Sequence, residues 1–220
     1  MGALLRLLSR TTPPASPAAG EVWYDAPGAR VRASDGLAGE PLVVGPTGNL
    51  PAVAAGRWHL IGTGFGNAAS INLTNERLLA VPFWPGRACE LNAVALNVTL
   101  ALVGGVVRIG LYESDGALPT NLVADYGTVG VGLTGTQSAT GLTTAVRPAL
   151  HFIALARQTG GLTLSVSGRS STDPLVSTST PTIAANPNAY FIDGVGGALP
   201  TSFGAPAGTD QGPCFRIQLA

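Results

Sequence analysis

The sequence predicts an all-β protein, a jelly-roll-like β-sandwich that follows an extended N-terminal docking arm and a small hairpin. Two observations lead to this prediction. The 220 residues include 30 glycines and 17 prolines, which leave little room for long helices. From Arg57 onward, short segments with strand-like apolar patterns are separated by turn residues. About eight or nine such segments can be counted, which suits a sandwich of two sheets.

Residues 1–56 form the first predicted unit. Leu4, Leu7 and Leu8 have the spacing of the apolar face of a short helix. The proline-rich segment TTPPASPAAG follows, and we expect it to be extended. The segment GEVWYDAPGARVRASDG then predicts two very short strands around a turn at residues 26–29. Such a hairpin is only marginally stable alone, so we expect it to need a partner surface.

Residues 57–220 form the second predicted unit, the sandwich. Apolar residues at alternate positions predict strands with one buried face, as in LNAVALNVTLA and LTLSVS. The C-terminal CFRIQL repeats this alternation, which predicts a strand at the end of the sequence. LHFIALA, residues 150–156, is apolar on both faces and therefore predicts a central strand that is covered on both sides. The remaining predicted strands are RWHLI, RLLAVPF, VVRIGLY, NLVADYGTV and NAYFI.

Charge and hydropathy argue against nucleic acid and membrane partners. Charged residues make up 11% of the sequence, the formal net charge is zero, and every basic residue is arginine. This balance provides no basic surface for nucleic acid or anionic lipid. The longest apolar stretch without charge, residues 91–107, is interrupted by polar residues and is shorter than the ~20 residues that span a bilayer. We therefore expect neither nucleic acid binding nor membrane insertion.

Residues for catalysis are sparse, and we expect no enzyme, no cofactor and no metal. His59 and His151 lie in strand-like segments, and the sequence contains no nucleophile elbow, phosphate-binding loop or metal-spaced Cys/His cluster. GTGFGN at residues 62–67 resembles a dinucleotide motif, but without a long preceding strand or a following helix it is better interpreted as a glycine loop. Cys89 and Cys214 could pair, although free thiols are favoured in a reducing cytosol.

Several acidic and aromatic residues are candidates for binding a glycan. Glu113 and Asp115 could act as paired carboxylates or calcium ligands, but a solvated acidic turn is the favoured interpretation. Trp84, between prolines in PFWPG, is expected to be partly exposed. An aromatic face beside polar groups suits a sugar ring. The candidate glycan-binding residues are Trp84, Tyr112, Asp115 and Asn121, and the wider set of aromatic candidates also includes Trp58, Tyr126 and Tyr190.

A longer pattern resembles a known module. RLLAVPFWPGRACELNAVALNVTLA, RIGLYESDGALPTNLVADYGTVGVGLTG and RPALHFIALARQTG together resemble a jelly-roll module of tail, fibre and head-decoration proteins of tailed bacteriophages. In that module a strand R-x-G-[IL]-Y is followed by a loop D-G-x-P-x-x-L and a strand ending in G-T-V. The matching residues are Arg108, Gly110, Leu111, Tyr112, Asp115, Gly116, Pro119, Leu122, Gly127, Thr128 and Val129. Between Gly116 and Pro119 this sequence has two residues where the module has one. The resemblance covers residues 77–157, and the segment before LHFIALA departs from it because Ala149 replaces the usual glycine.

The N-terminal segment has a resemblance of its own. GEVWYD with RVRASDG is similar to a segment near the start of phage tail and fibre proteins, matched by Gly20, Val22, Trp23, Tyr24, Asp25, Arg32 and Gly36. The resemblance implies that the arm docks on other virion proteins through Leu4, Leu7, Leu8, Trp23 and Tyr24 or through an unpaired edge of the hairpin. It also implies a homo-oligomer, with a trimer favoured.

Together the two resemblances imply a structural virion protein that is assembled in the cytoplasm of the host bacterium. The first hypothesis is a minor tail or fibre protein whose outward sandwich contacts host-surface glycans. A capsid decoration or head-fibre protein with a mainly structural role is the alternative. A small glycan hydrolase and a free-standing carbohydrate-binding protein are the competing hypotheses outside this class.

Overall fold

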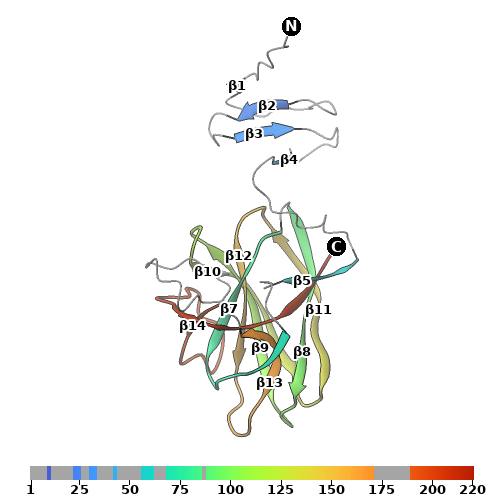
Figure 1. Ribbon diagram of the computed structural model, residues 1–220, viewed down its shortest axis with the longest axis vertical. Helices are drawn as coiled ribbons and strands as arrows, with labels where there is room; N and C mark the ends of the chain where they lie inside the picture. The colour runs from blue at the N-terminus through green and yellow to red at the C-terminus, as the bar shows by residue number, and fades with distance from the viewer. Residues whose placement is uncertain are drawn as a thin grey trace. The chain divides into compact units, whose positions relative to one another are not determined.

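The computed structural model describes residues 9–10, 22–25, 30–33, 42–43, 56–61, 68–85, 88–170 and 189–220. The chain divides into two compact units, residues 1–52 and 53–220, close to the predicted boundary after residue 56. The described residues form strands, turns and loops and contain no helix (Figure 1). The predicted all-β class is confirmed.

The N-terminal unit contains a four-stranded sheet in the order β1-β2-β3-β4. Its strands are β1 (Ser9–Arg10), β2 (Val22–Asp25), β3 (Arg30–Ala33) and β4 (Leu42–Val43). The antiparallel pair β2 and β3 confirms the predicted hairpin. The sequence predicts an unpaired edge on this hairpin, but β1 pairs with β2 and β4 pairs with β3. The outer edges of the sheet therefore belong to β1 and β4 and not to the hairpin. Trp23 and Tyr24 lie in β2, whereas Leu4, Leu7 and Leu8 lie outside the described residues.

The second unit is a β-sandwich of two antiparallel sheets (Figure 1). One, here called the β9 sheet, has the order β10-β9-β12-β7-β14-β15. Its strands are β10 (Pro119–Gly130), β9 (Val106–Ser114), β12 (His151–Arg157), β7 (Leu78–Phe83), β14 (Ala189–Ile192) and β15 (Ala207–Thr209). The other, the β8 sheet, contains β5 (Trp58–Ile61), β6 (Ala68–Asn72), β8 (Cys89–Leu100), β11 (Gly135–Val146), β13 (Ser165–Ser170), β16 (Gln211–Pro213) and β17 (Phe215–Leu219).

Each predicted strand has a counterpart, but LTLSVS is shifted, because β13 begins only at Ser165 and Leu162 is 80% exposed. The sequence did not reveal β1 and β4 in the first unit or β6, β11, β15 and β16 in the sandwich. The most extensive of these is β11, which pairs with β8 along nearly its whole length. Its sequence, GTQSATGLTTAV, is made mostly of small and polar residues, and its side chains alternate between half-buried and exposed. Hydrophobic periodicity cannot detect such a strand, because neither of its faces is strongly apolar.

Two hydrophobic cores stabilise the sandwich. The first lies between the sheets and includes Leu96 of β8 together with Leu111 of β9 and Ile153 of β12. The second lies on the opposite face of the β9 sheet, where Phe152 of β12 packs with residues of the chain that follows β14, such as Phe203. Every residue of β12 is consequently buried, which confirms that LHFIALA forms a central strand covered on both sides.

The hairpin of β9 and β10 contains most of the residues behind the phage resemblance, and they have structural roles. Arg108 donates from Nε to the Asp125 carboxylate at 2.8 and 2.9 Å, joining the two strands. Burial raises the pKa of Asp125, but hydrogen bonds from Arg108 and the Gly127 amide outweigh it and hold the pKa below its usual value. Gly127 has a φ of 76°, a conformation that favours glycine. The motif therefore describes how this hairpin is built.

Gly110 of β9 lies where a larger residue does not fit. A Cβ at this position would come within 2.9 Å of the Ala124 carbonyl oxygen and closer still to the end of the Leu199 side chain. We expect Gly110→Ala to lower the free energy of unfolding by about 1–3 kcal/mol through overpacking, as measured in denaturant melts. The matched control is Gly130→Ala in β10, where a Cβ would meet nothing within 4 Å. Equal stability of the two variants would contradict this role of Gly110.

Candidate functional site

The structure separates the residues that were predicted to bind a glycan. Trp84 follows β7 and is 47% exposed, which confirms its predicted partial exposure. Tyr112 is fully buried, with its ring edge-on to Phe203 at 5.2 Å between centroids. Its hydroxyl donates to the Pro200 carbonyl at 2.8 Å. Because no face of this ring reaches solvent, the prediction that Tyr112 contacts a sugar is wrong.

The other two predicted residues are exposed in the β9–β10 hairpin. The Asp115 carboxylate accepts hydrogen bonds from the backbone amides of Leu118 and Ala117 at 2.7 and 2.9 Å, and these lower its pKa. Asn121 in β10 forms an isolated backbone bridge with Ser202. Trp84 follows β7, which is separated from β9 by β12, a backbone separation of two strand spacings or about 10 Å. The arrangement does not gather these side chains around one cavity.

The polar residues that could support catalysis are dispersed. His151 is 5% exposed, and its Nδ1 lies 2.8 Å from the Ala149 carbonyl oxygen. Cys89 and Cys214 are not joined in a disulfide, and burial raises the pKa of Cys214 against an opposing effect of Arg169. Among the described residues, no group of His, Cys, Asp or Glu side chains is arranged to hold a metal ion. None of the described residues forms a helix that is long and apolar enough to cross a membrane.

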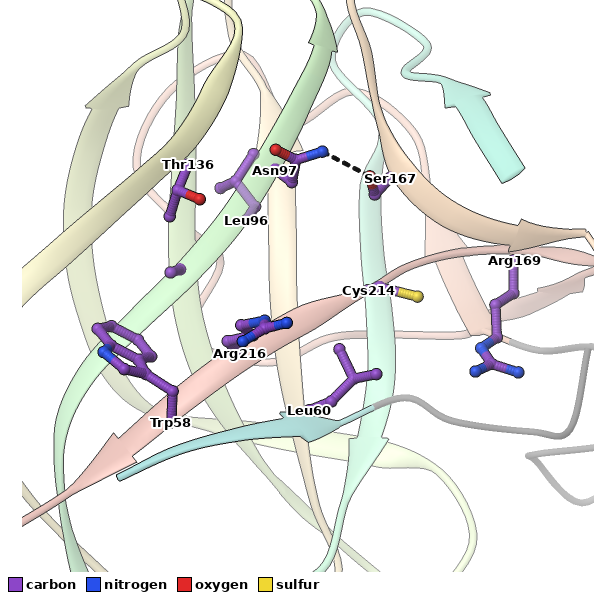
Figure 2. Close-up of a pocket in the computed structure, with 10 residues that line it drawn as sticks. Trp58, Leu60, Leu96, Asn97, Thr136, Ser167, Arg169, Cys214 and Arg216 are labelled. Atoms are coloured by element: carbon purple, nitrogen blue, oxygen red, sulfur yellow. Dashed lines mark hydrogen bonds between the residues drawn. The ribbon is translucent and has the colours of Figure 1, made fainter. Parts of the chain in front are cut away.

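A concave site of about 580 Å³, here called the outer-face concavity, lies on the β8 sheet. Figure 2 shows its lining side chains, which come from β5, β8, β11, β13 and β17 and from Cys214 just before β17. The lining residues are Trp58, Leu60, Ala95, Leu96, Asn97, Thr136, Ser167, Arg169, Cys214 and Arg216, of which Leu96 also belongs to the inter-sheet core. Most of these side chains are half-buried or exposed, as expected on the face opposite the inter-sheet core.

The concavity forms where the neighbour of β8 changes. β17 pairs with β8 from Leu91 to Leu96, and β13 pairs with it from Val98 onward. The Cys214 amide donates to the Ser167 carbonyl at 3.0 Å, which ties the start of β17 to β13. On the outer face of β8, Ala95 is only 2% exposed although it points away from the inter-sheet core. A small side chain at this place, surrounded by larger ones, leaves room for a ligand.

Aromatic, cationic and polar groups share the concavity. Trp58 on β5 is 40% exposed. Arg216 on β17 is paired in register with Leu60 of β5 on one side and with Ala95 of β8 on the other, so it stands in the middle of the site. Asn97 donates from Nδ2 to the Ser167 hydroxyl at 2.8 Å. The lining contains two arginines, Arg169 and Arg216, and no acidic residue.

Sequence reasoning named Trp58 only as one of several aromatic candidates and missed the concavity. One signal was available, because Trp58 and Leu60 are large apolar residues at alternate positions around His59. That pattern resembles any strand with an apolar face. In the structure this apolar face is the outer one, with Leu60 49% exposed.

Comparisons with known proteins identify no family for this sequence. No family model matches the sequence, and no curated protein matches it. One solved structure with a similar arrangement is that of the cysteine protease and lectin-like domains of Cwp84, a surface layer associated protein of Clostridium difficile. The TM-score is 0.44 at 12% identity, over 73% of this chain. The match spans 35% of the length of that protein chain.

Proposed function

We propose that this chain is a structural component of a tailed-bacteriophage virion, a minor tail or fibre protein with an outward β-sandwich. The observation that carries the proposal is the strand-loop-strand pattern from Arg108 to Val129, which resembles a module of phage tail, fibre and head-decoration proteins. This pattern lies in the β9–β10 hairpin. A second observation supports the proposal: a separate N-terminal unit contains VWYD, the segment similar to the start of such proteins.

The sandwich is proposed to contact host-surface glycans. Each single contact would be weak, and many copies on one particle would together give effective attachment. The outer-face concavity supports this role, because it combines an exposed indole with hydrogen-bonding side chains.

A capsid decoration or head-fibre protein is the second candidate, with the same two-unit plan but no need for a ligand. The homo-oligomer, with a trimer favoured, stays a prediction. Mass spectrometry and electron microscopy of purified particles test the location, and absence of the chain from them would contradict both candidates.

The N-terminal unit is proposed to be the docking device, through Leu4, Leu7, Leu8, Trp23 and Tyr24. We expect deletion of residues 1–19 to leave a soluble, folded sandwich that no longer incorporates into particles. The deletion removes the predicted apolar anchor and also β1, which pairs with β2. Incorporation is measured by mass spectrometry of particles assembled in cells that express either the full chain or the truncated one.

The control for this deletion is the stability of the sandwich itself. Its thermal unfolding transition should be unchanged, because the truncated residues belong to the other compact unit. Normal incorporation of a correctly folded truncated protein would move the docking surface onto the sandwich.

A further inference from the structure

We propose that the outer-face concavity binds an acidic sugar, a pyranose that carries a carboxylate, with its ring against Trp58 and its carboxylate on Arg216. The inference rests on the proposed glycan contact for its biological role. It names a place and a ligand class that differ from those expected from the sequence, which pointed to Trp84 and the β9–β10 turn. Three groups in the concavity would hold such a sugar: an indole, a guanidinium and a set of polar side chains.

Trp58 provides the surface for the sugar ring. Its side chain is 40% exposed and lies along the concavity, as Figure 2 shows. The apolar face of a pyranose packs against such a ring, while its hydroxyl groups remain available for hydrogen bonds. Trp58 belongs to β5, whose backbone pairs with β17 at Gln218, so the ring is held by a strand and not by a mobile loop.

Arg216 provides the charge. Among the described residues it forms no salt bridge, and the lining of the concavity contains no carboxylate. Trp58 lies diagonally across the β5–β17 ladder from Arg216, a separation of about 7–8 Å between such pairs, which a sugar ring and its carboxylate can span. A guanidinium binds a carboxylate through two parallel hydrogen bonds. A neutral sugar can accept hydrogen bonds from this group but forms no ion pair with it, so charge is the expected basis of selectivity.

Asn97, Ser167 and Thr136 provide hydrogen bonds for the hydroxyl groups. Asn97 and Thr136 are direct cross-strand neighbours on β8 and β11. The Asn97 amide nitrogen is oriented by its hydrogen bond to Ser167, which leaves the amide oxygen as an acceptor. Figure 2 shows these three side chains in a row above Trp58 and Arg216.

The three tryptophans of the chain allow a direct test by nuclear magnetic resonance of the purified full-length protein. Each indole N–H gives its own signal, and the Trp58→Phe and Trp84→Phe variants assign two of them. The probes are sodium glucuronate, sodium N-acetylneuraminate and neutral glucose. We expect one or both acidic sugars to shift the Trp58 signal with millimolar affinity, about the range of a single weak site, and glucose to leave it in place. The acid that shifts the Trp58 signal shows whether the site binds a uronic acid or a sialic acid.

Two arginine variants separate specific pairing from general charge. Arg216→Gln is expected to weaken acidic sugar binding about tenfold, and Arg147→Gln, which removes an exposed charge outside the concavity, is expected to leave it unchanged. The proposal is overturned if neither acid shifts the Trp58 signal at about 50 mM, if glucose shifts it equally, if the Trp84 signal moves instead, or if both variants behave alike. Because the titration uses purified protein, its outcome does not depend on whether the chain is found in particles.

Discussion

Phe152→Ala is expected to lower the free energy of unfolding by about 3–5 kcal/mol, the usual cost of deleting a fully buried phenylalanine. The ring is 0% exposed in β12 and packs against Tyr190 at 5.8 Å between centroids. Truncation would leave a cavity in the core on the far side of the β9 sheet, which also contains Phe203. Urea or guanidinium melts of the two proteins measure the difference.

An exposed leucine provides the control for this substitution. Leu133 is 74% exposed, and Leu133→Ala is expected to change stability by less than about 0.5 kcal/mol. A loss below about 1 kcal/mol for Phe152→Ala would mean that this ring is not part of a close-packed core. The core would then lie between the sheets alone.

Arg157→Met is expected to cost about 2–4 kcal/mol, because a buried guanidinium holds two loops together. Arg157 is 5% exposed. It donates to four backbone carbonyls, those of Thr159, Leu73, Leu162 and Gly161, at 2.8, 2.9, 2.6 and 3.5 Å. Methionine fills part of the volume but leaves these acceptors without their donor. Denaturant melts measure the loss, and proteolysis of the loop at residues 158–164 reports its local opening.

A conservative variant and a surface variant make the Arg157 test specific. Arg157→Lys is expected to recover part of the stability, since an ammonium donates hydrogen bonds but lacks the planar fork of a guanidinium. Arg147→Met, at an exposed position, should be close to neutral. Equal stability of Arg157→Met and Arg147→Met would contradict the proposed role.

The sequence predicted most strands correctly because burial leaves a direct trace in the amino-acid pattern. In β17, Phe215, Ile217 and Leu219 are buried, and the residues between them are exposed or half-buried, as the alternation predicts. In β12 the continuous apolar run corresponds to a strand with two buried faces. Side chains on successive strand residues point to opposite faces, so a local pattern is sufficient to identify the buried ones.

The candidate site was less predictable, because exposure depends on what covers a residue. Tyr112 and Trp58 are both aromatic residues within predicted strands, and the sequence offered no reason to treat them differently. Tyr112 is buried because the chain that follows β14 packs over its face of the β9 sheet and accepts a hydrogen bond at Pro200. Trp58 remains exposed on the outer face of the β8 sheet.

By itself, the sequence determined that this protein is all-β and which segments form its apolar strands, since strand periodicity is a local property of the chain. Only the tertiary structure decided that β11 is a strand, because its backbone hydrogen bonds with β8 replace the apolar pattern that it lacks. Only the tertiary structure decided where a ligand can bind. Trp58, Asn97 and Arg216 are far apart in the sequence, and the register of β5, β17 and β8 places them around one concavity.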